Sequence, residues 1–267
     1  MKGLLQLLKG IYSVYAFIMF LVIMLFLFPF SIIASFFGRI RGGNMMMRLC
    51  MLWADLWFFL IGMPHRRIFE APLDKNKSYI FVSNHISYLD AAIIPKAIRQ
   101  PVRPLGKVEM SRIPVFGFIY RNAIVTVDRS SAANRAKSVR ILTSLIHKGI
   151  SVLVFPEGTF NMTNAPLKEF YDGAFRVAIE TQTPVKPVLF LDAYRRMPYE
   201  SLFRMSPGRS RILYLAEVPV DGMTISDVGL LKEKVYRMME EKLIEYGGVG
   251  SQKSVVRSQQ PIIKRLG

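Results

Sequence analysis

The chain has 267 residues, of which 51% are hydrophobic, and its 36 lysines and arginines outweigh 19 acidic residues to give a formal charge of +17. This length suffices for one well-buried α/β domain with an additional segment. The one cysteine, Cys50, excludes a disulfide within the chain and a site of several thiolate ligands. The charge favours an anionic partner. Because the apolar residues concentrate near the N-terminus, a membrane surface is a better candidate than nucleic acid.

The N-terminal segment is apolar enough to enter a membrane. Residues 11–37 carry no charged side chain, and roughly 20 apolar residues are enough for a helix to cross a bilayer. The run is too long for the core of a signal peptide, so we expect it to be retained. Pro29 lies inside it and predicts a kink or a break, since proline removes a helical hydrogen bond.

A second apolar stretch follows over residues 45–64, but it includes Arg48 and Asp55. Those charges suit an interfacial or half-inserted helix better than a membrane span. Two arrangements remain open at this point. One is a plain transmembrane anchor, and the other is a pair of helices that turn at Pro29 and Gly42-Gly43, with both ends on the same side of one leaflet.

After residue 64, short apolar runs alternate with helical patterns, which predicts an α/β fold: a mixed sheet with helices on its faces. We expect membrane-embedded or interfacial helices over 1–64, a catalytic domain over 65–246 and a basic, flexible tail over 247–267. The predicted strands are 78–82, 123–127, 151–155, 185–191 and 211–216, and the predicted helices are 91–98, 132–147, 172–180 and 230–244.

The first chemically informative stretch runs from Asn84 to Asp90, directly after a predicted buried strand. His85 and Asp90 are separated by four residues. If Ser87 or a neighbour caps a new helix, the carboxylate lies in its first turn and can orient the imidazole. An imidazole with the ordinary pKa of about 6.5 can act as a general base at neutral pH. The spacing by itself is common and does not decide the function.

The second stretch, Phe155 to Thr159, follows another apolar strand. Pro156 ends that strand, and Gly158 permits an unusual backbone turn. Glu157 is then left at the end of the sheet, where a carboxylate could hold an acceptor hydroxyl or a basic side chain. A histidine–aspartate pair at one strand end and a glutamate at another predict an active site at this edge.

Together these stretches make the chain resemble the glycerolipid acyltransferases of the 1-acylglycerol-3-phosphate acyltransferase type, over roughly residues 78–220. Five blocks match in the expected order. They are Asn84, His85, Ser87 and Asp90 of the NHxSxxD block; residues 107–110 with Pro114, Phe116 and Gly117; residues 123–129; residues 155–159 of the FPEGT block; and residues 184–188.

The resemblance implies a direct transfer in which His85 deprotonates the acceptor hydroxyl, Asp90 orients His85, and the oxygen attacks an acyl thioester without a covalent enzyme intermediate. It implies no metal and no cofactor, with acyl-coenzyme A or acyl carrier protein as co-substrate. Lys107 and Arg129 would bind phosphate. The full set of implied substrate-binding residues is Asn84, Ser87, Lys107, Arg129, Glu157, Gly158 and Thr159.

The implied partners are membrane lipids, a lysolipid acceptor and the acyl thioester of acyl carrier protein or coenzyme A, with no nucleic acid. The implied location is a membrane, with the catalytic domain on its cytoplasmic face, and the implied process is phospholipid biosynthesis. A hydrolase is less well supported, because the chain has no G-x-S-x-G elbow.

Two departures from the family pattern concern the acceptor. Phe160-Asn161 stand where the family commonly has Arg-Ser after FPEGT, and Tyr171 stands where it commonly has lysine. Both changes remove positive charge from the expected phosphate site. Lysophosphatidate remains the first expectation. The alternatives are a lyso-aminolipid or another acceptor without phosphate, and a catalytically inactive membrane scaffold.

Overall fold

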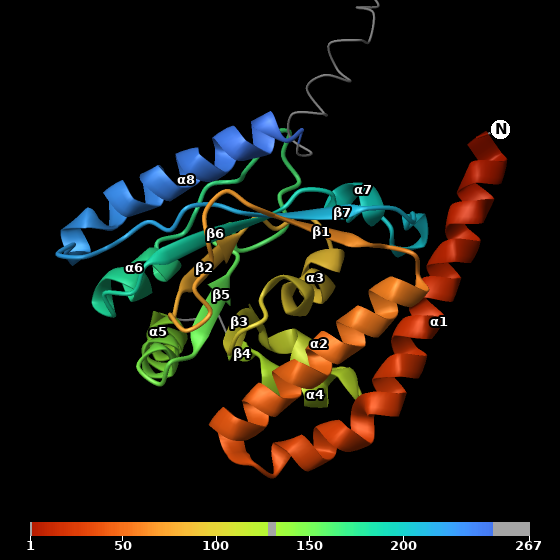
Figure 1. The fold of residues 1–267 in the computed structure, drawn as a ribbon, viewed down its shortest axis with the longest axis horizontal. Coiled ribbons are helices and arrows are strands. Elements are labelled where there is room, and N and C mark those ends of the chain that lie inside the picture. The colour runs from red at the N-terminus through yellow and green to blue at the C-terminus, as the bar shows by residue number, and fades with distance from the viewer. Residues whose placement is uncertain (1, 128–131, 248–267) are drawn as a thin grey trace, which may run out of the picture.

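The computed structural model describes residues 2–127 and 132–247, which form a mixed seven-stranded sheet with helices on both faces (Figure 1). Its strands are β1 (His65–Phe69), β2 (Ile80–Ser83), β3 (Val102–Lys107), β4 (Val125–Val127), β5 (Ser151–Val154), β6 (Val185–Phe190) and β7 (Ser210–Tyr214). Their order is β1-β7-β6-β2-β5-β3-β4. The strands from β6 to β4 are parallel, whereas β7 is antiparallel to β6. The predicted α/β class is therefore confirmed.

The helices divide between the two faces of the sheet. In chain order they are α1 (Lys2–Ser35), α2 (Gly43–Leu60), α3 (Leu89–Ala97), α4 (Phe116–Ala123), α5 (Ala132–Ile146), α6 (Gly173–Glu180), α7 (Ala193–Arg196) and α8 (Val228–Glu245). Short π- or 3₁₀-helical turns are η1 (Gly38–Gly42), η2 (Val108–Arg112), η3 (Leu202–Arg204) and η4 (Ile225–Asp227). Helices α5, α6 and α8 cover one face, and α1 to α4 lie on the other (Figure 1).

The strands are buried on both faces, which explains why they read as continuous apolar runs in the sequence. Successive side chains of β2 point to opposite faces, as strand geometry requires. Ile80 and Val82 belong to the core under α5, α6 and α8, whereas Phe81 belongs to the core under α1 to α4.

Helices α1 and α2, joined by η1, form an antiparallel hairpin, which we call the N-terminal hairpin. The Tyr12 hydroxyl of α1 donates to the Ile61 carbonyl at 2.6 Å, and the Trp57 Nε1–H of α2 donates to the Ala16 carbonyl at 2.8 Å. Pro29 does not break α1. The helix continues through it and bends in its second half (Figure 1).

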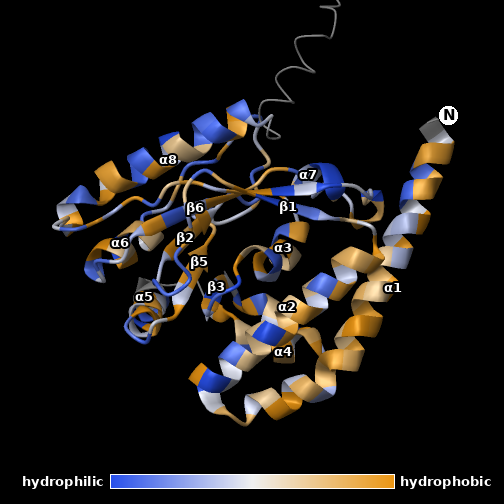
Figure 2. Ribbon diagram, viewed as in Figure 1, coloured by the Kyte–Doolittle hydropathy of each residue, from blue (hydrophilic) through white to orange (hydrophobic). Residues whose placement is uncertain are grey.

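Helix α1 is hydrophobic along most of its length, whereas α2 mixes hydrophobic and hydrophilic residues (Figure 2). Among the described residues, one helix is both long enough and apolar enough to cross a membrane, and it covers Gly3–Ser35. Outward side chains such as Phe26 are 70% exposed, whereas Met46 and Ala54 of α2 are fully buried in the core that the hairpin shares with the sheet. The hairpin is thus packed onto the domain that follows it.

Two strands and two α-helices were not predicted from the sequence: β1, β3, α4 and α7. Strand β1 is polar and half exposed, and β3 contains Pro104 and Gly106, which are uncommon inside strands. Both form because neighbouring strands supply the hydrogen bonds, a tertiary effect that an apolar pattern does not encode. Of the predicted tail, residues 248–267 lie outside the described part of the chain.

Candidate active site

The two predicted motifs meet at one edge of the sheet. Strands β2 and β5 are parallel neighbours, so Ser83 at the end of β2 and Val154 at the end of β5 lie at the same edge. The segments that follow them carry His85 and Glu157. This is the edge at which α/β sheets commonly bind ligands, since loops from several strands converge there.

His85 and Asp90 form the predicted pair. The His85 Nδ1 lies 2.9 Å from the Asp90 Oδ2, and the histidine side chain is 22% exposed while the aspartate is fully buried. Since a carboxylate oxygen accepts hydrogen bonds, Nδ1 carries the proton and Nε2 keeps a lone pair. The imidazole is therefore oriented, in the tautomer needed for a base, and remains accessible from solvent.

Asp90 is held by the backbone of the loop as well as by the histidine. Its Oδ2 accepts hydrogen bonds from the Ile86 and Ser87 amides at 2.7 and 2.9 Å. The carboxylate lies in the first turn of α3, where the helix dipole favours negative charge. The Ser87 hydroxyl accepts from the Leu89 amide at 3.0 Å and donates to the Met197 carbonyl at 2.6 Å, which fixes the start of the helix.

Glu157 clamps the backbone of His85. Its two carboxyl oxygens accept from the His85 amide at 2.7 Å and the Lys168 amide at 2.9 Å, and the side chain is fully buried. The His85 carbonyl in turn accepts from the Asn161 amide at 2.8 Å. Burial raises the pKa of Glu157 to about 8, with a smaller contribution in the same direction from the nearby Asp90 charge.

Aromatic rings enclose the imidazole. Phe155 stacks on it with ring centroids 4.1 Å apart and an interplanar angle of 13°, and Phe160 meets it edge-on at 4.4 Å. Tyr88 packs edge-on against Phe160 at 4.8 Å. These contacts fix the plane of the ring and surround it with apolar surface. In the sequence, Phe155 and Phe160 stand on either side of Pro156–Thr159. The sequence pattern alone did not predict that their rings contact the imidazole.

The structure buries three of the predicted substrate-binding side chains. Asn84 donates to the Phe190 carbonyl at 3.2 Å and accepts from the Phe190 amide at 2.9 Å, which ties β2 to β6. Ser87 and Glu157 are fully buried and bonded to backbone groups. All three therefore shape the loops around His85. Direct contact between any of them and a substrate stays a prediction that this geometry does not favour.

Of the other predicted residues, Gly158 is buried, whereas Thr159 and Lys107 are exposed. Gly158 has a φ of 74°, a left-handed conformation that favours glycine, and the following Thr159 is exposed. Lys107 is exposed at the end of β3. Because β5 lies between β2 and β3, Lys107 is about 10 Å from the end of β2. Arg129 lies outside the described residues, so its predicted role stays a prediction.

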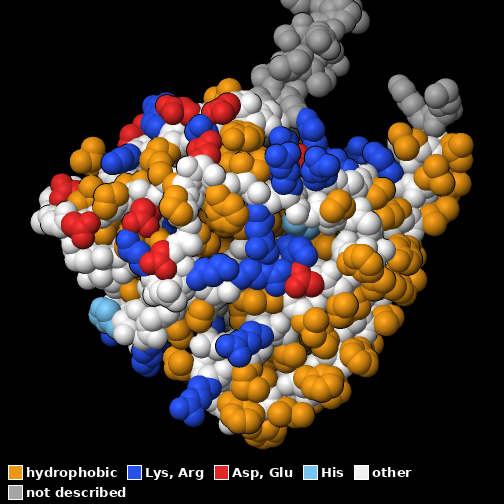
Figure 3. Space-filling view, in the orientation of Figure 1, with side chains coloured by type: hydrophobic (Ala, Val, Ile, Leu, Met, Phe, Trp, Pro, Cys, Tyr) orange, Lys and Arg blue, Asp and Glu red, His pale blue; other side chains and the backbone are white. Residues whose placement is uncertain are grey.

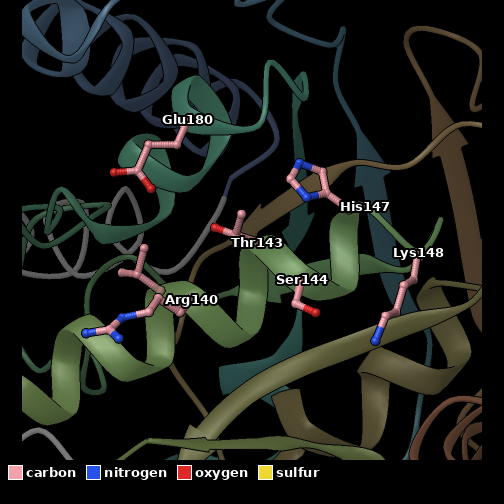
Figure 4. A pocket seen from close by; sticks show the side chains of 7 residues that line it. Arg140, Thr143, Ser144, His147, Lys148 and Glu180 are labelled. Atoms are coloured by element: carbon pink, nitrogen blue, oxygen red, sulfur yellow. The ribbon is translucent and has the colours of Figure 1, made fainter.

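A shallow hollow of about 560 Å³ lies elsewhere, between α5 and α6 (Figure 4). Its lining includes Arg140, Thr143, His147, Lys148 and Glu180. His147 and Glu180 lie at or just past the ends of helices that lead into the beginnings of β5 and β6, and those strand beginnings are at the edge opposite His85. None of the predicted site residues lines this hollow, so its size does not make it the active site.

Comparison with known proteins agrees with the fold and with the family resemblance. The family model described as Acyltransferase matches residues 67–191, which include His85, Asp90 and Glu157. The crystal structure of the 1-acyl-sn-glycerophosphate acyltransferase of Thermotoga maritima superposes with a TM-score of 0.71, covering 92% of this chain and 97% of that one at 21% identity. At that identity the likeness shows the fold alone.

Two relatives are similar in sequence. The 1-acyl-sn-glycerol-3-phosphate acyltransferase alpha of Homo sapiens is 27% identical over 166 residues, which is 61% of this chain and 58% of the human protein. The 1-acyl-sn-glycerol-3-phosphate acyltransferase of Cocos nucifera is 25% identical over 245 residues, which is 91% of this chain and 72% of the coconut protein. The match thus spans less than two thirds of the human relative.

Proposed function

Because the chain belongs to the glycerolipid acyltransferase family, we propose that it transfers a fatty acyl group from a thioester to a hydroxyl of a lysolipid. The observation that carries this proposal is the His85–Asp90 hydrogen bond, which orients an accessible imidazole with Nε2 free to accept a proton. The predicted roles of these two residues are consistent with that geometry.

In the proposed reaction, the His85 Nε2 takes the proton from the acceptor hydroxyl as its oxygen attacks the thioester carbonyl carbon. A new ester C–O bond forms and the C–S bond breaks. The leaving thiolate then receives the proton from the imidazolium. Asp90 stabilises that imidazolium through the hydrogen bond to Nδ1 and keeps the ring in the required tautomer.

The surrounding residues support the same step. Glu157 and Asn161 bind the backbone of His85 on both sides, so the ring is held where the loop places it. Phe155 and Phe160 cover much of the imidazole with apolar surface. Apolar surface beside the base suits a lipid acceptor better than water and so favours acyl transfer over hydrolysis of the thioester.

The first candidate for the acceptor is 1-acylglycerol-3-phosphate, which the names of the human and coconut relatives support. The donor would be acyl-coenzyme A or the thioester of acyl carrier protein, and the product would serve phospholipid biosynthesis. Lys107 and Arg129 are the cations expected to bind phosphate. No metal or cofactor is part of the proposed reaction.

We further propose that the enzyme is membrane-bound through its N-terminal hairpin. The outer surface of α1 exposes large apolar side chains, among them Leu25 at 55%, Phe26 at 70% and Phe30 at 51%. Lysine and arginine side chains gather beside this apolar surface (Figure 3). Cations in that position favour an anionic leaflet, consistent with a cytoplasmic face.

One observation favours a second candidate, an acceptor without phosphate such as a lyso-aminolipid. Phe160 stands where a cation was expected and packs against the His85 ring, so that position offers an apolar surface instead of a charge. A membrane scaffold without activity is the remaining alternative.

The proposal can be tested with protein purified in detergent, a labelled acyl thioester and a panel of lysolipids. Transfer of label to lysophosphatidate is the expected result. Transfer only to acceptors without phosphate would keep the mechanism and change the substrate. Label that appears only as free fatty acid, whatever acceptor is present, would identify a hydrolase, and binding without any turnover would identify a scaffold.

A further inference from the structure

The active-site edge has a cation at a position where the sequence patterns did not predict one. The family pattern predicts positive charge at two positions, which Phe160 and Tyr171 occupy here. Phe160 contacts the His85 ring, and Tyr171 is uncharged and 66% exposed. Neither can pair with an anionic headgroup. Lys168, which belongs to neither block, lies against the turn that contains Glu157 and Thr159.

The backbone of Lys168 is fixed to this turn. Its amide donates to the Glu157 Oε2 at 2.9 Å, and the Tyr171 amide donates to the Pro156 carbonyl at 2.9 Å. Leu167 and Phe170 on either side are buried, at 2% and 3% exposure. The segment therefore runs alongside the turn and holds the lysine at the same edge of the sheet as His85.

The ammonium group of Lys168 has a neutral partner. Its Nζ donates to the Thr159 Oγ1 at 2.9 Å, and among the described residues no carboxylate forms an ion pair with it. Lys77, Lys96 and Lys232, by contrast, are each within 2.7 Å of a carboxylate oxygen. Glu157 accepts from the backbone amide of Lys168, and its carboxyl forms no ion pair with the ammonium group among the described residues.

We propose that Lys168 and Thr159 together bind the phosphate of the lysolipid acceptor and so determine acceptor specificity, an inference that rests on the proposed acyl transfer. Because Thr159 accepts one hydrogen bond, the ammonium has two N–H groups without a partner among the described residues, and these can donate. Because Thr159 accepts from Lys168, its own hydroxyl hydrogen can donate to the same anion. The pair thus offers several donors and one positive charge to a phosphate group.

Position along the substrate favours the acceptor phosphate over the phosphates of the thioester donor. In a 1-acylglycerol phosphate, the phosphate is only a few bonds from the reacting hydroxyl, which must reach the His85 Nε2. In a pantetheine thioester, the phosphates are separated from the reacting carbonyl by the whole pantetheine arm. Thr159 is adjacent in sequence to Phe160, whose ring contacts His85, so this cation is placed for a nearby phosphate.

The test compares Lys168→Ala and Lys168→Arg with wild type, using lysophosphatidate and the uncharged monoacylglycerol as acceptors. For Lys168→Ala we expect the KM for lysophosphatidate to rise about 10- to 100-fold, as for the loss of a charge-assisted hydrogen bond. We expect kcat, the KM for the thioester and the KM for monoacylglycerol to stay within about twofold. Lys168→Arg should restore most of the lysophosphatidate affinity. Lys148→Ala, an exposed lysine at the opposite edge, is the matched control.

An unchanged KM for lysophosphatidate, an equal rise for both acceptors, or a rise for the thioester instead would overturn the inference. Equilibrium binding of lysophosphatidate without thioester keeps this test independent of turnover. If wild type binds lysophosphatidate and Lys168→Ala does not, the inference stands even where acyl transfer fails. If wild type does not bind lysophosphatidate at all, the inference is wrong, whatever acceptor the enzyme uses.

Discussion

In the loop that carries His85, the segment after β5 forms hydrogen bonds with both the amide and the carbonyl of His85. The N-terminal hairpin, by contrast, is held mainly by contacts between apolar side chains. The loop buries Ser87, Asp90 and Glu157 completely, each with hydrogen-bond partners. The outer side of the hairpin is apolar and has no partner in the described chain. Directional bonds hold the catalytic geometry, while nondirectional burial suits a surface that meets lipid.

This comparison predicts that the loop is most sensitive to changes of single polar atoms. In Asp90→Asn, the amide oxygen can replace Oδ2 as the acceptor for Nδ1 and for the Ile86 and Ser87 amides, but the negative charge that stabilises the imidazolium is lost. We expect kcat for acyl transfer to fall about 10²- to 10⁴-fold. The measurement is the steady-state rate with saturating thioester and acceptor. An unchanged melting temperature would show that the loss is chemical, whereas full activity would contradict the role assigned to the Asp90 charge.

The hairpin should respond to changes of apolar volume, and differently on its two sides. Met46→Ala removes a fully buried side chain and should lower the free energy of unfolding by about 2–5 kcal/mol. Phe26→Ser on the exposed side should change it by less than about 0.5 kcal/mol but weaken binding to anionic vesicles. Denaturant unfolding in detergent and vesicle flotation measure the two effects. Equal losses of stability would contradict the distinction between the two sides.

Glu157 should make the stability of the loop depend on pH. Burial raises its pKa from 4.5 to about 8, so between these values the folded protein holds a proton that the unfolded chain has released. The contribution of Glu157 to the free energy of unfolding is complete below pH 4.5. It is lost as the pH rises from 4.5 through 8, and the loss is on the order of a few kcal/mol. The melting temperature of wild type should therefore fall relative to that of Glu157→Gln as the pH rises over this range. Parallel pH profiles for the two proteins would contradict this assignment.

The smallest effect is expected at the ion pairs that link the two regions. Asp55 of α2 pairs with Lys96 at 2.6 Å and with Arg99, but its side chain is 43% exposed. Exposed pairs of this kind contribute little because solvent screens them, so Asp55→Ala should cost no more than about 1 kcal/mol. Denaturant unfolding at low and high salt measures it. A larger and salt-independent loss would mean that these pairs, in addition to apolar burial, fix the hairpin.

The catalytic pair could be predicted from the sequence because its geometry is local. The spacing from His85 to Asp90 and Ser87, whose hydroxyl accepts from the Leu89 amide, are enough to fold the carboxylate back onto the imidazole at the start of α3. The buried strands β2 and β5 were also predicted, since strands covered on both faces are recognisable as short apolar runs.

The rest depends on contacts between distant segments. The apolar run before Glu157 predicts its position at a sheet end, but only pairing of β2 with β5 brings it to the His85 amide. Lys168 belongs to no recognised motif. Its hydrogen bond with Thr159 depends on how the segment between Thr159 and Phe170 folds back. Strand β1 is polar and exposed, and pairing with β7 decides its conformation.

The central claim is that His85 acts as the general base, and the most direct measurement is single-turnover acyl transfer by His85→Ala beside wild type. His147→Ala is the matched control, since His147 is exposed at the opposite edge of the sheet. The account predicts that His85→Ala still folds and binds the thioester but loses acceptor-dependent transfer by at least about 10²-fold, while His147→Ala retains it. Transfer by His85→Ala at a rate close to that of wild type would contradict the account.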